Sequence, residues 1–303
     1  MRHRRYPFIV GFLAAPVALY LTFVVGPYLQ AFYLALTDWR GVSANPRIIG
    51  LDNFAQLLRD DRFWQAIQHH GILLVVLPAA TILIGLFFAF MLNVGGGSRG
   101  GAMHGVWGSK FYRVVFFFPQ VLAVVIIGVI FSRVYAPDHS GLLNGVLGWF
   151  GAGPVRFLAD SRLALWAIIG ALVWQAVGFY VVLFSAGMAS IPTDIYEAAL
   201  IDGAGRGAMF FRVTLPLLWQ TLQVAWVYLG IAAFDAFAIV QVMSVDQGGP
   251  DGATTVLGLE IYRNAFTYSQ FGYASAMGVA LFFLTITFAA LALRVTRREA
   301  VEL

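Results

Sequence analysis

The sequence has 303 residues, of which 60% are hydrophobic and only 11% are charged; soluble globular domains carry about 25% charged residues, so an ordinary soluble protein and a disordered chain are both excluded. The absence of cysteine excludes disulfides and cysteine metal sites, and the net charge of +4 comes without a basic cluster long enough to follow a nucleic-acid backbone. We therefore expect a protein embedded in a lipid bilayer, with no nucleic acid among its partners.

Six long apolar runs are the main structural signal. A membrane-spanning helix needs about 20 apolar residues, and five runs of about this length or longer lack any charge, while another contains one acid. They lie between Arg5 and Asp38, between Arg62 and Arg99 with the apolar part starting near Gly71, between Arg113 and Arg133, between Arg162 and Asp194, from Leu217 to Val245 with Asp235 inside, and between Arg263 and Arg294. Apolar residues occur without an alternating period, which favours helices over barrel strands. The sequence predicts an all-α integral membrane protein with six transmembrane helices.

The ends of the chain indicate its orientation. Both termini are basic, and basic residues favour the cytoplasmic side. Two cytoplasmic termini require an even number of spans, which six satisfies. The first run could instead be a cleaved signal peptide, but the apolar stretch from Phe8 to Leu36 is about twice as long as a signal core. We expect it to be retained as a span.

Three connecting segments have a recognisable character. The first outer loop, from Asp38 to His70, contains a predicted amphipathic helix from Leu51 to Ile67. The loop from Arg133 to Arg162 contains an apolar piece at Leu142–Phe150. The inner segment from Gly95 to Gly108 is rich in glycine but lacks the G-x-x-x-x-G-K-[ST] pattern of a phosphate-binding loop, so we interpret it as a flexible connector.

The inner loop at residues 190–218 is the part of the sequence that is most informative about function. Thr193 is a predicted helix N-cap, Asp194 suits the positive end of a helix dipole, and Gly203 and Gly205 are predicted to end the helix. The loop therefore predicts a short helix of about ten residues outside the bilayer, followed by a second helix from Ala208.

This short helix has two interpretations. Its apolar face, predicted to consist of Ile195, Ala198 and Ala199, could dock into a groove on a soluble partner. The helix could instead be a structural turn that joins two spans. Physical features of the segment leave both interpretations open.

A resemblance favours the first interpretation. The string Glu197-Ala-Ala-x-x-Asp202-Gly-Ala, followed by Phe211 and Leu215-Pro216, resembles the EAA loop of permease subunits in binding-protein-dependent ABC importers. The likeness extends along the chain through Gly50-Leu-Asp-Asn-Phe54, Arg113 with Phe118-Pro119, Gly141-Leu-Leu-Asn144 and Gly248-Gly-Pro250, which are similar to the carbohydrate-importing branch. The closest likeness is to actinobacterial permeases for N-acetylglucosamine or chitobiose-type sugars.

The resemblance implies a type I importer permease fold, with residues 1–303 as a single permease domain in the bacterial plasma membrane. It implies that the loop couples the pore to an ATPase through Tyr196, Glu197, Ala198, Ala199, Asp202, Gly203, Ala204 and Gly205. The implied partners are a second, similar permease, two cytoplasmic ATPase subunits and an extracellular solute-binding protein that delivers a sugar. ATP and magnesium would be bound by the ATPase subunits, so this chain is expected to be a transport subunit and not an enzyme.

Asp235 is the first candidate contact for the substrate. An aspartate at the centre of a membrane helix costs about 2.5–3.5 kcal/mol, so it should face a cavity or a partner, and a sugar hydroxyl is a natural donor to it. The alternatives are a structural hydrogen bond between helices, a position near the outer interface, or an ion site in a secondary, ion-coupled sugar transporter. For the function of the whole chain, a membrane scaffold without transport activity is a further alternative.

Trp174, Gln175 and Gln241 are further candidates, because an aromatic face can stack on a sugar ring and an amide can bind its hydroxyls. They could instead be a packed indole and amides that join helices. Two positions depart from the family pattern. His69-His70 stand where relatives often carry Asn-Thr, and Ala233 and Ala236 stand where the maltose branch has amides. Adjacent histidines point apart on a helix, so no metal site is expected there.

Overall fold

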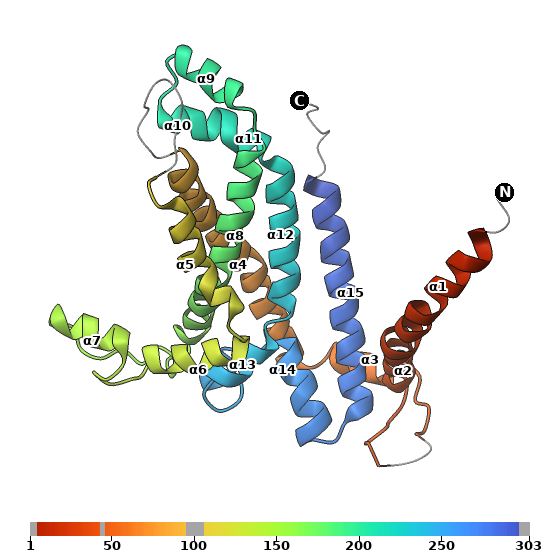
Figure 1. Ribbon diagram of the computed structural model, residues 1–303. Helices are drawn as coiled ribbons and strands as arrows, with labels where there is room; N and C mark the ends of the chain where they lie inside the picture. Colours follow the sequence, from red (N-terminus) through yellow and green to blue (C-terminus); the bar gives the residue numbers. More distant parts are fainter. Residues whose placement is uncertain (1–4, 43–45, 95–105, 297–303) are drawn as a thin grey trace. The chain divides into compact units, whose positions relative to one another are not determined.

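The computed structural model describes residues 5–42, 46–94 and 106–296, which are almost wholly helical (Figure 1). Four helices are long and apolar enough to cross a membrane, and two bent helix pairs raise the number to six if each pair is one span. Five of these segments overlap the predicted apolar runs closely, and the other, Arg206–Leu217 with Trp219–Phe234, begins before the predicted run from Leu217 to Val245 and ends inside it. The helical segments confirm the predicted all-α membrane architecture. The glycine-rich connector lies almost entirely outside the described residues.

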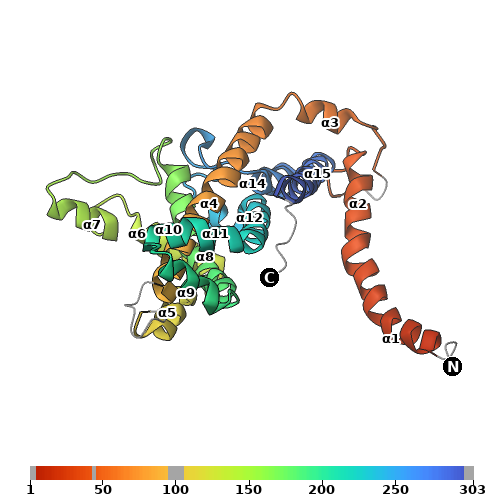
Figure 2. The same ribbon diagram turned by 90° about the horizontal axis from the view of Figure 1, so that it is seen from above.

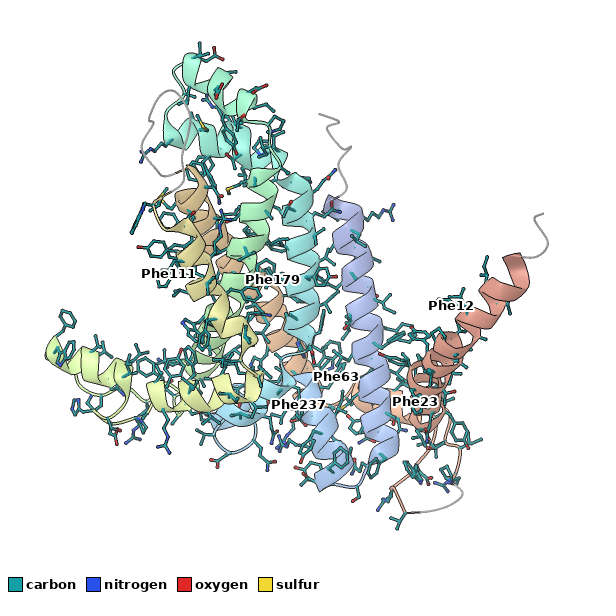
Figure 3. All side chains as sticks on the ribbon, in the orientation of Figure 1. Phe12, Phe23, Phe63, Phe111, Phe179 and Phe237 are labelled. Atoms are coloured by element: carbon teal, nitrogen blue, oxygen red, sulfur yellow. The ribbon has the colours of Figure 1, made fainter. Side chains whose placement is uncertain are left out.

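The helices expose apolar side chains as well as burying them. Phe12, Phe23 and Phe111 are 71%, 72% and 68% exposed, and Figure 3 shows them among many apolar side chains that project from the helices. Soluble proteins rarely expose apolar surface on this scale, so this surface is suited to contact with lipid.

The chain divides into two compact units, Met1–Trp64 with Glu260–Leu284 and Gln65–Leu259 with Thr285–Leu303. The first unit contains α1 (Arg5–Tyr20), the π-helical turn η1 (Leu21–Val25), α2 (Gly26–Ala35), α3 (Asp52–Leu57), η4 (Arg263–Thr267) and the first part of α15 (Phe271–Thr296). The single permease domain expected over residues 1–303 stays a prediction.

The start of α4 (Asp61–Val94) corrects one expectation in the first unit. The predicted amphipathic helix from Leu51 to Ile67 is two helices, because the chain leaves α3 after Leu57 and Asp60 then caps α4. Asp60 Oδ1 accepts a hydrogen bond from the Arg62 N–H at 2.9 Å, as a helix cap does. From there α4 runs for 34 residues and continues through Gly71, near which the apolar part of the run was expected to begin.

The second unit is built around α8 (Ala164–Ala189). Half of its most apolar window is buried, and its residues Ile168 and Phe184 are fully enclosed. They share one core cluster with Leu73 and Leu77 of α4 and Leu229 of α12 (Trp219–Phe234). A helix that is apolar on all sides belongs in the interior of a bundle, and Figures 1 and 2 show α4, α8 and α12 beside one another.

The remaining helices of this unit surround that core. They are α5 (Ser109–Val121), α6 (Val124–Val134), α7 (Leu142–Trp149), α9 (Thr193–Ile201), α10 (Arg206–Met209), η2 (Phe210–Thr214), α11 (Leu215–Leu217), α13 (Phe237–Met243), the 3-10 turn η3 (Pro250–Gly252) and the first part of α14 (Leu257–Tyr262). The apolar piece predicted at Leu142–Phe150 is confirmed as α7.

Two of the predicted spans are not straight helices. The third run forms α5 and α6, which meet at an angle of 99° because Leu122 and Ala123 adopt extended conformations with ψ of 139° and 138°. The fifth run is interrupted at Asp235, where α12 ends, and α13 begins two residues later. Apolar composition alone therefore located these segments but did not reveal their breaks.

We expect Gly178→Ala to weaken the packing of α5 on α8. A Cβ atom at Gly178 would overlap the backbone O and C atoms of Phe116, and forced overpacking costs about 1–3 kcal/mol. The thermal unfolding temperature of the purified complex should fall. Gly71→Ala on α4 is the matched control, because a Cβ there meets nothing within 4 Å; equal unfolding temperatures for the two variants would contradict the prediction.

Candidate functional site

The start of α9 lies one residue from the predicted position. Pro192 is the N-cap, with φ −54° and ψ 135°, and Thr193 is the first helical residue, so the prediction of Thr193 as N-cap is wrong. The proline fixes φ and its extended ψ places the entry to the helix before Thr193. Asp194 lies in the first turn, as predicted, where the helix dipole favours negative charge.

Gly203 ends this helix in the way that the sequence predicted. It has φ +77°, a left-handed conformation that other residues adopt at a cost. The Gly203 N–H donates to Leu200 O at 3.0 Å, and the Ala204 N–H donates to Ala199 O at 2.9 Å. This pair of bonds is the Schellman motif. Gly205, by contrast, is the N-cap of α10 and has φ −70°.

Tyr196 attaches α9 to the rest of the loop. Its side chain is 8% exposed, and its hydroxyl lies 3.3 Å from the Thr214 hydroxyl, which donates to Met209 O at 3.3 Å. Burial raises the pKa of the Tyr196 phenol, so the group stays neutral and keeps its proton for hydrogen bonding. α9 is thus fixed to η2 and not held by its chain ends alone.

The outward face of α9 differs from the predicted docking face. Ile195 and Ala199 are half-buried against the core of the unit, while Ala198 is exposed as predicted. Glu197 is exposed on the same side, and Ile201 is 87% exposed. Glu197 and Ala198 precede Ile201 by four and three residues, which places each of them beside Ile201 on the helix surface. The accessible apolar contact of α9 is therefore centred on Ile201.

The eight predicted coupling residues are close together in sequence but differ in exposure. Glu197, Ala198, Asp202, Gly203 and Gly205 are exposed, Ala199 and Ala204 are half-buried, and Tyr196 is buried. Figure 1 shows α9 and α10 near the same end of α8. Their contact with an ATPase stays a prediction.

Asp235 lies at a helix break, which the sequence did not indicate. It is the C-cap of α12, its N–H donates to Ala232 O at 3.1 Å, and its side chain is exposed. The expectation of a carboxylate inside a continuous helix is wrong, because the chain leaves the helix at this residue. Ala233 and Ala236, which lie near Asp235 in sequence, are buried and apolar. The Asp235 carboxylate is therefore the polar side chain of this turn.

The aromatic and amide candidates do not share one pocket. Trp174 lines a groove of about 580 Å³ with Phe88, Phe116 and Pro119, and its ring lies 5.2 Å from that of Phe131. Gln175, the next residue on α8, is half-buried and does not line this groove.

Gln241 on α13 has a distinctive environment. Its Oε1 atom is buried and, among the described residues, has no hydrogen-bond partner. Buried polar atoms are nearly always hydrogen-bonded, so this unpaired oxygen is unusual.

Sequence reasoning missed a polar seam on α4, formed by Gln65, His69 and His70. Gln65 Nε2 donates to Asp251 O at 3.0 Å, and His69 Nδ1 lies 2.7 Å from Thr255 O. His70 also contacts backbone groups, through both ring nitrogens. The signal was present as polar residues spaced four and five apart at the start of an apolar helix.

The opposite end of α4 has a second polar cluster that composition did not reveal. Asn93 Nδ2 donates to Ser185 Oγ at 2.9 Å, and Arg113 Nη2 donates to Asn93 Oδ1 at 2.6 Å. These bonds join α4, α5 and α8, and they give the arginine a neutral partner inside the bundle.

Comparison with known proteins agrees with this geometry. Residues 93–301 match the family model of the binding-protein-dependent transport system inner membrane component. The chain is 41% identical to the diacetylchitobiose uptake system permease protein NgcF of Streptomyces coelicolor, over 97% of this chain and 83% of that protein. It is 33% identical to the multiple sugar-binding transport system permease protein MsmF of Streptococcus mutans, over 90% and 89% of the two chains.

A solved structure shares the fold. A chain of the bacterial alginate ABC transporter, crystallised with an alginate pentasaccharide-bound periplasmic protein, aligns with a TM-score of 0.79 and 22% identity, over 98% of this chain and 96% of that one. This chain therefore belongs to the family of binding-protein-dependent transport system inner membrane components and is a multi-pass membrane permease subunit of the ABC importer class.

Proposed function

We propose that this chain is the permease subunit through which an ABC importer moves an N-acetylglucosamine disaccharide of the diacetylchitobiose type. The identity of 41% with NgcF, over 97% of this chain, carries the proposal. Several further relatives are named as sugar permeases. An identity of this extent supports a related sugar as substrate, and not only a shared fold.

The working transporter would contain more than this chain. We infer a second permease subunit, two cytoplasmic ATPase subunits that bind ATP and magnesium, and an extracellular solute-binding protein. The family description names binding-protein dependence, and the alginate transporter was crystallised with its sugar-bound periplasmic protein. The chain itself lacks the phosphate-loop pattern, which is consistent with ATP hydrolysis elsewhere.

The exposed face of α9 would contact the ATPase. Ile201 offers an accessible apolar group, and Glu197 and Asp202 offer charges beside it. A buried apolar contact surrounded by polar groups is the usual composition of a protein interface. Because Tyr196 fixes α9 to η2, and η2 continues through α11 toward α12, a displacement of α9 would be passed to the membrane helices.

Asp235 and Gln241 are the strongest candidates for contact with sugar in this chain. The Asp235 carboxylate is exposed at a helix break, and the Gln241 amide oxygen is buried with no partner among the described residues. Both are acceptors, and sugar hydroxyls are donors that suit them. The Gln241 oxygen would have to become accessible during the transport cycle. Trp174 would add an aromatic face at a separate groove.

Uptake of radiolabelled diacetylchitobiose tests the proposal. A host that lacks this gene should lose uptake, and the restored gene should return it only when the cognate ATPase is present. Uptake should continue when the proton gradient is collapsed and ATP is maintained. Normal uptake without the ATPase, together with loss on collapse of the gradient, would instead support an ion-coupled transporter that uses Asp235.

Gly203→Val should uncouple transport from ATP hydrolysis. A side chain at φ +77° destabilises the turn, by about 1–2 kcal/mol for an ordinary residue, which corresponds to roughly tenfold in the population of the correct turn. Sugar uptake should fall by this order while the amount of protein in the membrane is unchanged. Gly203→Asn is the control, since asparagine tolerates the left-handed conformation; equal activity of the two variants would refute the role of the turn.

Asp235→Ala should lower uptake without lowering membrane abundance or co-purification of the ATPase. Loss of a hydrogen bond to a charged group costs about 1.5–3 kcal/mol, or roughly tenfold and more in uptake at low sugar concentration. Asp235→Asn keeps an acceptor and should retain more activity than alanine. Loss of assembly in the alanine variant would show that the carboxylate has a structural role.

A further inference from the structure

The imidazole of His70 connects the end of one helix to the beginning of another. His70 is 1% exposed on α4. Its Nδ1 atom lies 3.1 Å from Ala233 O, in the last turn of α12, and its Nε2 atom accepts a hydrogen bond from the Leu257 N–H, at the start of α14, at 3.1 Å. The ring also packs against Phe234, with 5.3 Å between ring centroids.

These contacts define the chemical state of the ring. A carbonyl oxygen accepts only, so Nδ1 must carry the hydrogen; an amide N–H donates only, so Nε2 must be bare. The bonds therefore require the neutral imidazole with its proton on Nδ1. Few side chains combine a donor and an acceptor at these two positions.

The two backbone groups need such a partner. The last carbonyl groups of a helix and its first N–H groups have no partner within the helix. Ala233 and Leu257 are both fully buried, so water does not supply one, and an unpaired buried peptide group is unfavourable. One histidine satisfies a free group at each helix end.

The other two residues of the polar seam contact backbone groups in the segment between α12 and α14. Gln65 binds Asp251 O and His69 contacts Thr255 O. Asp251 has a left-handed φ of 55°, and so do Asp246 and Gln247 at 51° and 52°. Strained residues persist only where surrounding contacts fix them. The polar seam thus fixes backbone groups before the turn at Asp235 and at two points, Asp251 and Thr255, of the segment that follows it.

We propose that His70 is a positioning residue of the sugar pathway, which keeps α12 ended at Asp235 and so presents that carboxylate. The proposal rests on the proposed function, in which Asp235 contacts the sugar. His70 touches no substrate; it acts through the two backbone bonds that fix the break. Without them, the break is no longer held and residue 235 changes its accessibility.

Because the chain contains no cysteine, a single Asp235→Cys substitution gives a clean probe of this break. The full chain, co-purified with its partner subunits in lipid nanodiscs, is treated with a water-soluble maleimide and the rate of labelling is measured. Uptake of diacetylchitobiose is measured separately with Asp235 intact. Both measurements are made with His70→Phe, which keeps a ring and removes both bonds, and with Gln68→Phe, an exposed position on the same helix, as control.

Two milder variants separate the bonds. His70→Asn places a donor near the position of Nδ1, and His70→Gln places an acceptor near that of Nε2. They also keep the test decisive if His70→Phe does not fold, because each removes one bond while leaving a polar side chain.

His70→Phe should change the labelling rate of residue 235 and lower uptake, each by at least about tenfold, because both hydrogen bonds of the imidazole are lost. The asparagine and glutamine variants should lie between it and the parent, and Gln68→Phe should behave as the parent. Labelling that stays within twofold in every His70 variant overturns the proposal, whatever happens to uptake. The labelling needs no sugar, so it tests the role of His70 even if diacetylchitobiose proves not to be the substrate.

Discussion

Peptide groups buried away from water need hydrogen-bond partners, and several helices of this chain end in buried places. α12 ends at the buried Phe234, and α14 begins at the buried Leu257. His70 on α4 satisfies a backbone group at each of these ends. The end of α12 and the start of α14 therefore depend on a side chain that the long helix α4 supplies.

The loop that contains α9 follows the same principle in an exposed setting. Backbone hydrogen bonds around Gly203 close the C-terminal end of α9. The hydroxyls of Tyr196 and Thr214 fix the buried side of the helix. These contacts leave Glu197 and Ile201 exposed on the outer side. A helix this short is marginal on its own, so its rigidity comes from these attachments.

Composition was sufficient to predict the class of fold and the location of five of the six apolar segments, since the need for about 20 apolar residues is a strong constraint. The turn at Gly203 was also predictable, because glycine is favoured where φ is positive. The breaks at Leu122 and Asp235 were not, because apolar runs look alike whether the helix within them is straight or interrupted.

The candidate site was predictable to a similar degree. The EAA loop placed the predicted coupling residues on α9 and the turn after it, but the outward position of Ile201 depends on how α9 packs against the core. The role of His70 in holding two helix ends depends on contacts with residues more than 160 positions away in sequence. Such contacts leave no local pattern, so only the three-dimensional arrangement reveals them.

The length of α4 has a mechanical consequence. Gln65, His69 and His70 make their polar contacts near one end, and Asn93 makes its contacts near the other. At 1.5 Å per residue these ends are roughly 40 Å apart, more than the thickness of a hydrocarbon layer of about 30 Å. Because polar contacts hold α4 at both ends, a displacement of one end would be passed through the helix, including Pro78 in its interior, to the other end.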